Sequence, residues 1–430
     1  MVTDLLMQLY VSLIALGFKL TFLESAIESA EDNEVSRQRI HEGGPEAANL
    51  HIISLLNSPN VVFTYLFRME KAIFAKLCKW LRLNTQLADT RYQTVEHKIM
   101  VFLFVMVFGA TQRETAFFFK IAQSTVSSVF HEVIDPMRKL HLEFVTQPNE
   151  ASLSPEVELE PKHAAFSGCI GAIDGTHVAA HVPAKYQHKF WNRKNKLTQN
   201  VFAAVRFDRT FTYILAGGEG RLHDARLCRL AFLHGFRIPD GRCYLGDAGF
   251  GIQPGLLVPY PNTRYHLQDW RDALNKPETK EELYNLRHAR LRIIIEQTFG
   301  GLKRKFKILR DNPPEYSFGD QVKIVYATTG LWNFIRKDGI PGDESSKYVP
   351  DELQYDIERA AEVIRNSSPR DLRDHIARAN WDSYRSYMEE KDDENDENDE
   401  FDDVGEGLDD SSDENEDEGG MRAFEGGRKW

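Results

Sequence analysis

Cysteine is scarce in this 430-residue sequence, and the spacing of the few cysteines excludes two common kinds of site. Cys78, Cys169, Cys228 and Cys243 lie far apart and include no Cys-x-x-Cys pair. Neither a disulfide framework nor a zinc ribbon is therefore indicated. A reducing compartment is the simplest interpretation.

The sequence also lacks an uninterrupted apolar run and a phosphate-binding loop. Residues 5–23 are long and apolar enough to suggest a membrane span, but four polar residues interrupt them and no basic residue precedes them. We expect a partner-binding or core helix there, and not a membrane segment or signal peptide.

The glycines at 217–220 have no Gly-Lys-Ser/Thr after them, which excludes a phosphate-binding loop, and they lack the glycine spacing of a dinucleotide-binding motif.

Positive charge is in deficit overall, but only because of one segment. The chain carries −12; residues 389–418 hold 19 acids against one lysine, giving −18, and residues 421–430 carry +2, so residues 1–388 carry +4. The remainder of the chain is therefore mildly basic and compatible with a nucleic-acid partner. The acidic segment predicts a disordered tail.

Hydrophobic periodicity and composition divide the chain into six parts. Helical spacing dominates the first half, whereas short apolar runs alternate with helical stretches in the second. We predict a flexible link from Glu24 to Pro59 and a helix over 63–81. The predicted parts are an apolar N-terminal helix with that link (1–60), a helical region (61–147), a linker (148–163), an α/β domain (164–340), C-terminal helices (341–388) and the acidic tail (389–430).

Within the helical region, residues 111–134 have the pattern of a helix-turn-helix. A short helix, a tight turn and a second helix with a serine N-cap are predicted, and an ordinary helical hairpin fits about equally well. The second helix would offer small polar side chains to a DNA groove, which suits weak and mostly non-specific contact. These candidates are Ser124, Thr125, Ser127 and Ser128.

Three acids in apolar surroundings are the leading candidates for chemistry. Asp174 follows a short apolar run and opens a Gly-Thr turn, Asp247 repeats this design, and Glu296 lies in a strongly apolar helical segment. We expect strands over 168–174 and 178–182 around the first acid. Buried carboxylates are costly unless they are paired, protonated or metal-bound. Three of them indicate a site for a hard cation such as Mg²⁺, although an ion pair with a nearby arginine is the simpler explanation for Glu296 alone.

Basic residues surround these acids and are candidates for phosphate contacts. They occur in a loop rich in aromatics after the first acid and again at the end of the long helix. A solvated charged loop is the alternative. The candidates are Lys189, Arg193, Lys194, Lys196, Lys303 and Arg304.

Three further residues near the acids are candidates for orienting the acids from behind: His223, Asp224 and His177. Asp224 is expected to N-cap a helix that begins at Ala225, and His223 could support the site from behind. His177, which directly follows Gly175 and Thr176, is a candidate for the same supporting role.

Five ordered blocks of this sequence resemble the PIF/Harbinger transposases and the nucleases derived from Harbinger transposases. The blocks are Ile-Asp-Gly-Thr-His (173–177), Asn-Arg-Lys (192–194), the stretch from Gly220 to Arg226, Leu-Gly-Asp-Ala-Gly-Phe (245–250) and Ile-Glu-Gln-Thr-Phe-Gly (295–300). The likeness covers about residues 63–337. Phe250 and Gln297 depart from the tyrosine and arginine that the family often has.

The resemblance implies an RNase H-like DDE domain preceded by a helix-turn-helix module. It puts Asp174, Asp247 and Glu296 in catalytic and metal-binding positions, with two Mg²⁺ or Mn²⁺ ions serving phosphodiester hydrolysis and possible strand transfer. It also implies DNA as substrate, the nucleus as location and a Myb/SANT-like partner for specific recognition; a second copy of the chain is a further candidate partner. The alternative is a domesticated DNA-binding or adaptor protein in which the acids are unused.

Overall fold

The computed structural model describes residues 44–148, 161–264, 276–310, 316–338 and 351–394. The apolar segment 5–23 and most of the acidic tail lie outside these residues, so the predictions about them stay predictions. Among the described helices, none is by itself long and apolar enough to cross a membrane. The helices α2 (Gly44–Asn57) and α3 (Asn60–Phe67) reach the required length and apolar character only together, with a bend of 113° between them.

The N-terminal part is a bundle of helices, as predicted for residues 61–147, but it begins earlier. Residues 44–57 form a helix, so the prediction of a flexible link up to Pro59 is wrong for this stretch. The helix predicted over 63–81 is in fact two, because Arg68 adopts a left-handed conformation with φ of 54° and ends the first. The helices are α2 (Gly44–Asn57), α3 (Asn60–Phe67), α4 (Lys71–Asn84), α5 (Val95–Phe108), α6 (Gln112–Phe119) and α7 (Gln123–Phe144).

The second part is built on a five-stranded mixed sheet. Its order is β3-β2-β1-β4-β5; β1 pairs antiparallel with β2 and parallel with β4, β2 pairs antiparallel with β3, and β4 pairs parallel with β5. The predicted α/β class is confirmed. The strands are β1 (Cys169–Ala179), β2 (Thr198–Val205), β3 (Phe211–Glu219), β4 (Cys243–Leu245) and β5 (Leu256–Leu257).

The first strand differs from the prediction. Two short strands separated by a Gly-Thr turn were expected, but β1 runs without a turn through Asp174, Gly175 and Thr176 to Ala179. Antiparallel pairing with β2 along the whole stretch explains this, since Asp174 pairs with Ala203 and Thr176 with Val201. Asp174 therefore lies in the middle of a central strand and not at a strand end.

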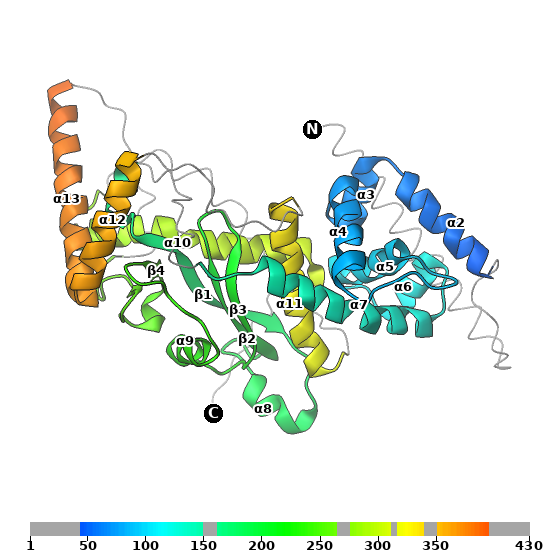
Figure 1. Cartoon of the computed structure of the whole chain (residues 1–430). Coiled ribbons are helices and arrows are strands. Elements are labelled where there is room, and N and C mark those ends of the chain that lie inside the picture. Colours follow the sequence, from blue (N-terminus) through cyan, green and yellow to red (C-terminus); the bar gives the residue numbers. More distant parts are fainter. Residues whose placement is uncertain (1–43, 149–160, 265–275, 311–315, 339–350, 395–430) are drawn as a thin grey trace, which may run out of the picture.

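Helices cover both faces of the sheet (Figure 1). On β2, Val201, Ala203 and Val205 belong to the core shared with α10, whereas Phe202 and Ala204 belong to the core under α9. This alternation is the period of two that a strand buried on both faces must show. The helices are α8 (Gln187–Phe190), α9 (Asp224–Leu233), α10 (Lys280–Lys305), α11 (Phe318–Arg336), α12 (Asp351–Asn366) and α13 (Pro369–Glu394), with short 3₁₀ turns η2 (Pro161–Phe166), η3 (Ala184–Tyr186), η4 (Ala248–Phe250) and η6 (Lys307–Leu309).

The long helix α10 begins and ends where its sequence predicts. The side chain of Thr279 accepts a hydrogen bond from the Glu282 N–H, and two acids lie in the first turn. Three basic residues, Lys303 to Lys305, lie in the last turn. Both placements favour the helix dipole, and the N-terminal end of this helix is therefore well fixed beside the sheet.

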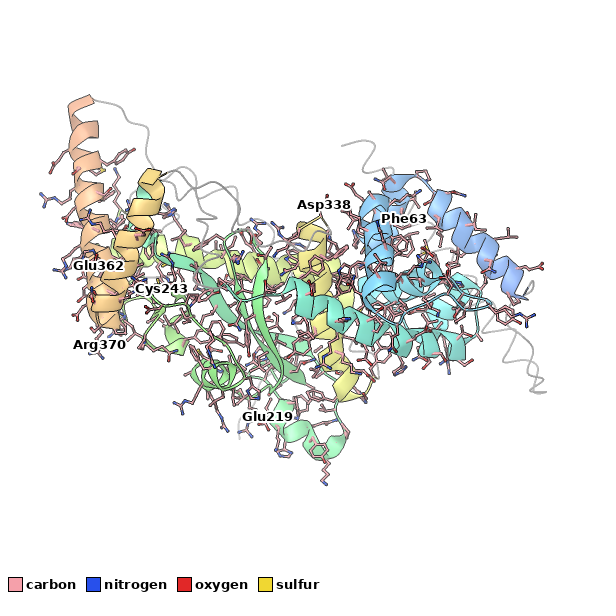
Figure 2. The ribbon with its side chains drawn as sticks, in the orientation of Figure 1. Phe63, Glu219, Cys243, Asp338, Glu362 and Arg370 are labelled. Carbon is pink, nitrogen blue, oxygen red and sulfur yellow. The ribbon has the colours of Figure 1, made fainter. Side chains whose placement is uncertain are left out.

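The C-terminal helices extend the α/β part and also differ in their limits. The predicted C-terminal helices (341–388) are α12 and α13, which are separated at Ser367 and Ser368, and α13 continues to Glu394, beyond the predicted start of the tail at 389. Buried α13 residues Leu372, Ile376 and Ala377 join the main core. Figure 2 shows Arg370 at the periphery, where α13 begins, and Cys243, in β4, nearer the centre.

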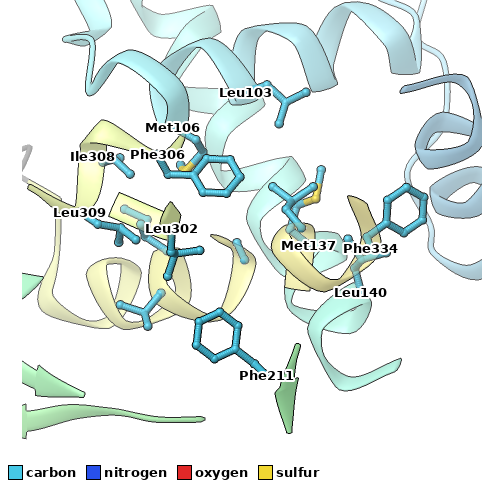
Figure 3. Packing of buried hydrophobic residues seen from close by; sticks show 14 of the residues in the cluster. Leu103, Met106, Met137, Leu140, Phe211, Leu302, Phe306, Ile308, Leu309 and Phe334 are labelled. Carbon is cyan, nitrogen blue, oxygen red and sulfur yellow. The ribbon is translucent and has the colours of Figure 1, made fainter. Parts of the chain in front are cut away.

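The two parts of the chain share one hydrophobic core. Figure 3 shows side chains of α5 and α7, among them Met106 and Leu140, facing Leu302, Phe306 and Phe334 of the α/β part. Asn333 of α11 donates hydrogen bonds to the backbone oxygens of Phe144 (2.9 Å) and Phe211 (2.7 Å). The second helix of the predicted helix-turn-helix is therefore fused to the α/β part through α11, and is not on a separately tethered module.

We predict that the close approach of α7 and α11 makes Gly330 irreplaceable. A Cβ atom there would lie 2.7 Å from the His141 Cα atom, which belongs to rigid helix backbone. Gly330→Ala should lower the free energy of unfolding by about 1–3 kcal/mol, measured by urea denaturation. Gly319→Ala on the same helix is the control, because its Cβ would meet nothing closer than Ser317 Oγ at 3.8 Å. Equal losses for the two variants would contradict this packing.

Candidate active site

Asp174 is a largely buried carboxylate in the centre of β1. Its side chain is 21% exposed, Oδ1 accepts a hydrogen bond from the Gly175 N–H (2.7 Å), and Oδ2 lies 3.4 Å from Nη1 of Arg292. Burial raises the pKa of Asp174 to about 7, with Arg292 and the Gly175 N–H opposing this rise and the charges of Glu296 and Asp247 adding to it. The carboxylate is therefore partly protonated near neutral pH.

Asp247 directly follows β4, the parallel neighbour of the strand that carries Asp174. Its Oδ1 accepts a hydrogen bond from the Ala248 N–H (2.8 Å), which fixes the first turn of η4. Because β1 and β4 are parallel neighbours, with Ala172 opposite Leu245, this acid is brought close to Asp174. The sequence prediction that Asp247 ends a strand and opens a glycine turn is confirmed.

Glu296 lies on α10 and is less buried than predicted. Its side chain is 50% exposed, although the neighbouring Ile295 is fully buried. It forms an ion pair with Arg292 one turn earlier, so the simpler explanation considered for Glu296 describes what this structure shows. Arg292, only 13% exposed, thus bridges Glu296 and Asp174.

The three predicted acids come near enough for their charges to interact, but they do not form a closed ligand set. The charges of Glu296 and Asp247 both oppose ionisation of Asp174 and so raise its pKa. Within the described residues, however, no group of three or more His, Cys, Asp or Glu side chains could together hold a metal ion. The positively charged Arg292 balances two of the acids instead.

Lys303 and His177 form the rim of the site on the α10 side. Nζ of Lys303 donates hydrogen bonds to Thr176 Oγ1 (3.0 Å) and to the His177 backbone oxygen (2.9 Å). Burial lowers the pKa of His177, Lys303 and Arg193 lower it further, and its Nδ1 lies 3.0 Å from Thr198 Oγ1. Lys303 therefore fixes the end of β1 against α10, besides any role toward DNA.

Asp224 does not cap α9 as predicted. His223 occupies the N-cap position, without a side-chain hydrogen bond, and Asp224 is the first helical residue. A Cβ atom on Gly175 would lie 3.3 Å from Asp224 Oδ1, and one on Gly249 would lie 3.0 Å from Oδ2. Burial raises the pKa of Asp224, and the Asp247 charge adds to the rise. Asp224 is a fourth acid of the site, on the opposite side of β1 from Arg292.

The basic loop after β1 contacts the start of α9 through Arg193. Nη2 of Arg193 lies 3.0 Å from His223 Nδ1, which links the loop to α9. Lys194 and Lys196 are exposed, and their N–H groups donate to the side chain of Asn192, which shapes the turn. Lys189 pairs with Glu219 at 3.4 Å. Arg304 is exposed at the end of α10.

The predicted helix-turn-helix has the expected order but not the expected cap. Lys120 adopts a left-handed conformation after α6, and α7 begins three residues later with Ala122 at the N-cap, so the predicted serine cap is wrong. Ser124 and Ser128 are exposed, and Thr125 and Ser127 are half-buried. These four side chains remain candidates for DNA contact.

One set of exposed basic residues was not predicted from the sequence. Arg221, Arg226 and Arg229 are exposed on and just before α9, and no acidic side chain among the described residues pairs with them. Together with His223, Arg226 and Arg229 line a hollow of about 510 Å³ on the outer face of this helix. The i, i+3 spacing of Arg226 and Arg229 in the sequence indicates one helix face. Its relevance to the site follows only from the position of α9 beside the acids.

Comparison with known proteins identifies the segment that carries these acids. Residues 173–333 match the family described as DDE superfamily endonuclease, and residues 47–139 match a domain of unknown function. The first of these segments is therefore similar to the DDE superfamily endonucleases. The resemblance predicted from the sequence is therefore confirmed.

Individual relatives are distant and matched only in part. An Arabidopsis thaliana protein named ALP1-like is 26% identical over 44% of this chain and 48% of its own length. The Arabidopsis protein named Antagonist of Like Heterochromatin Protein 1 is 22% identical over 60% of this chain and 68% of its own length. Human HARBI1, named as a candidate nuclease, is 24% identical over 51% of this chain and 61% of its own length.

The chain thus spans about half the length of the first of these relatives. No solved structure matches this chain.

The raised pKa of Asp174 predicts a pH-dependent stability. The folded state keeps the Asp174 proton up to about pH 7, whereas the unfolded carboxyl loses it near 3.8. The free energy of unfolding should therefore fall as pH rises from about 4 to about 7 and then level off. Asp174→Asn lacks this loss, so its stability relative to wild type should rise by up to about 4 kcal/mol between pH 4 and pH 8.

The measurement is urea denaturation at both pH values in EDTA. Asp135→Asn on α7 is the control, because that exposed acid pairs only with Lys323 at the surface. A difference between Asp174→Asn and wild type that is the same at both pH values would contradict a buried, protonated Asp174.

Proposed function

We propose that this protein is a metal-dependent DNA endonuclease of the PIF/Harbinger type, with Asp174, Asp247 and Glu296 as its catalytic acids. The observation that carries the proposal is that Arg292 pairs with both Asp174 and Glu296 while Asp247 follows the neighbouring strand β4, all within a segment that matches the DDE superfamily endonuclease family. The strand order β3-β2-β1-β4-β5, with the first three strands antiparallel and the last two parallel additions, supports an RNase H-like domain.

The residues present fit a divalent cation by their chemistry. The candidate donors are all carboxylates, which are the ligands that Mg²⁺ and Mn²⁺ prefer. Gly175 and Gly249 let the backbone approach the Asp224 carboxylate closely, since a Cβ atom would lie 3.3 Å from its Oδ1 at Gly175 and 3.0 Å from its Oδ2 at Gly249. Divalent cations held by Asp174, Asp247 and Glu296 would supply the activated water and the charge stabilisation that phosphodiester hydrolysis requires.

The chain's own residues prepare this site in three ways. Burial keeps Asp174 partly protonated, which limits repulsion among the acids until cations arrive. Arg292 neutralises Asp174 and Glu296. With cations bound to these two acids, its guanidinium would be positioned to contact a phosphate. Lys303 ties β1 to α10, so the two elements that carry these acids keep a fixed separation.

Basic groups on both sides of the acids define the proposed DNA path. Arg304 lies at the end of α10, and Arg193 with the α9 arginines Arg226 and Arg229 lies on the other side. Exposed arginines are suited to neutralising phosphates. The exposed hydroxyl side chains at the start of α7 provide a second, weaker contact surface in this proposal.

We further infer action in the nucleus together with a Myb/SANT-like partner that supplies specific recognition. The exposed polar groups at the start of α7 are small and uncharged, which suits non-specific contact and leaves sequence readout to another protein. The heterochromatin-related name of one relative accords with a chromatin context.

The second candidate function is a DNA-binding or adaptor protein whose acids are unused. One observation favours it: Arg292 already pairs with Asp174 and Glu296, so these acids are balanced without any cation. This function requires DNA or partner binding without cleavage.

We predict that the purified chain cuts supercoiled DNA in the presence of Mg²⁺ or Mn²⁺ and that Asp247→Ala and Asp174→Ala do not. The expected loss is at least about 100-fold, because removing one charged group from such a centre has effects of that size. Asp135→Ala, remote on α7, should cut like wild type. Cleavage by the Asp174 and Asp247 variants would refute the site, and binding without cleavage by every form would favour the adaptor function.

We also predict that the outer face of α9 contributes to DNA affinity. Arg226→Glu with Arg229→Glu should weaken binding of a non-specific duplex at least about 10-fold at low salt and reduce the slope of log K against log salt by about 2. Fluorescence anisotropy at several salt concentrations measures both. Arg370→Glu with Arg378→Glu on α13 is the matched control, since these arginines are also exposed on a helix. Equal effects of the two pairs would show only a change in net charge.

A further inference from the structure

The helical part carries a hollow on its surface, lined by residues of α2, α3, α4 and α5. This bundle hollow has a volume of about 400 Å³. Its apolar lining includes Leu56 and the buried aromatic rings of Phe63 and Phe74. Leu83 also lines it and is 73% exposed. An apolar hollow with an exposed leucine beside it favours the binding of another apolar segment.

An exposed apolar stripe on α2 leads to the bundle hollow. Leu50 is 67% exposed and Ile53 is 52% exposed, although the opposite side of this helix is buried in the core. Leu50, Ile53 and Leu56 follow one another at i, i+3 spacing, so they lie along one side of α2, and Leu56 lines the hollow. Figure 1 shows α2 at the outer edge of the helical part. The α2 stripe therefore extends the apolar surface of the hollow.

The apolar segment 5–23, which lies outside the described residues, has the pattern of a helix that fits such a surface. Six of its leucines recur at alternating steps of three and four residues. On an α-helix this spacing puts all six on one stripe, which needs an apolar partner surface. Docking of a helix into an apolar groove is a common solution. The leucines are Leu6, Leu9, Leu13, Leu16, Leu20 and Leu23.

The length of the intervening chain favours the segment of the same molecule as the occupant. Residues 24–43 separate the segment from α2, and a flexible chain of 20 residues has a root-mean-square span of roughly 25 Å. Leu56 lies near the far end of α2, about 20 Å from Gly44 at 1.5 Å per residue. Because the span matches this distance, the tether gives an effective concentration on the order of millimolar, above that of a second copy in dilute solution.

Charge favours the same placement. Residues 24–34, which directly follow the apolar segment, carry five acids and no base. Lys71, Lys79 and Arg82 line the bundle hollow. Arg82 pairs with Glu96, whereas the structure shows no ion pair of Lys71 or Lys79 with any described residue. A segment seated in the hollow would bring its following acids toward these two lysines, where opposite charges attract.

We propose that the apolar segment 5–23 binds as a helix, within its own chain, to the surface formed by the bundle hollow and the α2 stripe. Its leucine stripe covers Leu83 and Ile53, and the acids after it lie toward Lys71 and Lys79. The segment thereby completes the core of the helical part. This inference is independent of the proposed nuclease function.

The test is thiol cross-linking in the full chain with a short bismaleimide. Leu83→Cys is combined in turn with Leu13→Cys, Leu16→Cys and Leu20→Cys; the four native cysteines are buried and compete little. At least one pair should cross-link within one chain, at least about 10-fold faster than the same positions combined with Leu142→Cys. Leu142 on α7 is the matched control, because it is also a leucine that is 65% exposed on a helix of the same bundle.

A second measurement does not depend on which positions meet. A bimane fluorophore on Leu16→Cys should emit at shorter wavelength in the full chain than in urea, because docking places it in apolar surroundings. Leu83→Glu should shift this emission toward the value in urea, since it puts a charge into the binding surface. Leu142→Glu should leave the emission unchanged. Both leucines are exposed, so neither change disturbs the core, and circular dichroism checks the fold.

The outcomes distinguish the occupants. Cross-links between two chains that increase with protein concentration would assign the surface to a second copy and overturn docking within one chain. Equal cross-linking rates with Leu83→Cys and Leu142→Cys, or an emission that neither glutamate changes, would overturn the docking itself. None of these results depends on DNA cleavage, so each leaves the nuclease proposal to its own test.

Discussion

The site depends on the burial of a carboxylate in the middle of a central strand. A strand covered by helices on both faces offers Asp174 little water, so the charge must be suppressed or balanced. Arg292 supplies the balance from α10, and partial protonation supplies the rest. The arrangement holds the acids close together without a cation, at the cost of strong coupling among their charges. A cation or a phosphate that enters this space changes that coupling directly.

A second constraint joins the helical and α/β parts into one body. Asn333 sits where α7, β3 and α11 meet; its side chain donates to two backbone oxygens and accepts from the Phe211 N–H (2.9 Å). Full satisfaction of a buried amide fixes the angle between these elements more strictly than apolar contact does. The small polar side chains at the start of α7 therefore keep a constant orientation relative to the three candidate acids.

Much of this architecture follows from local pattern. The N-terminal limits of α10 and α11 are set by side-chain caps, at Thr279 and at Ser317, and Arg209 in the hairpin between β2 and β3 adopts a left-handed conformation. Local pattern failed where pairing partners decide the structure. The Gly-Thr pair after Asp174 has turn-forming residues, but hydrogen bonds to β2 keep it extended. Tertiary pairing outweighs the intrinsic preference of a glycine.

The sequence by itself determined which acids are the candidates, because Asp174, Asp247 and Glu296 stand in apolar segments and in blocks specific enough to reveal the family resemblance. Only the tertiary structure decided what surrounds each acid. The exposure of Glu296, the bridging by Arg292 and the place of Asp224 between two glycines depend on how α9 and α10 lie against β1. Arg292 lies 118 positions from Asp174, and Asp224 belongs to a different element from either glycine, so no local pattern encodes these contacts.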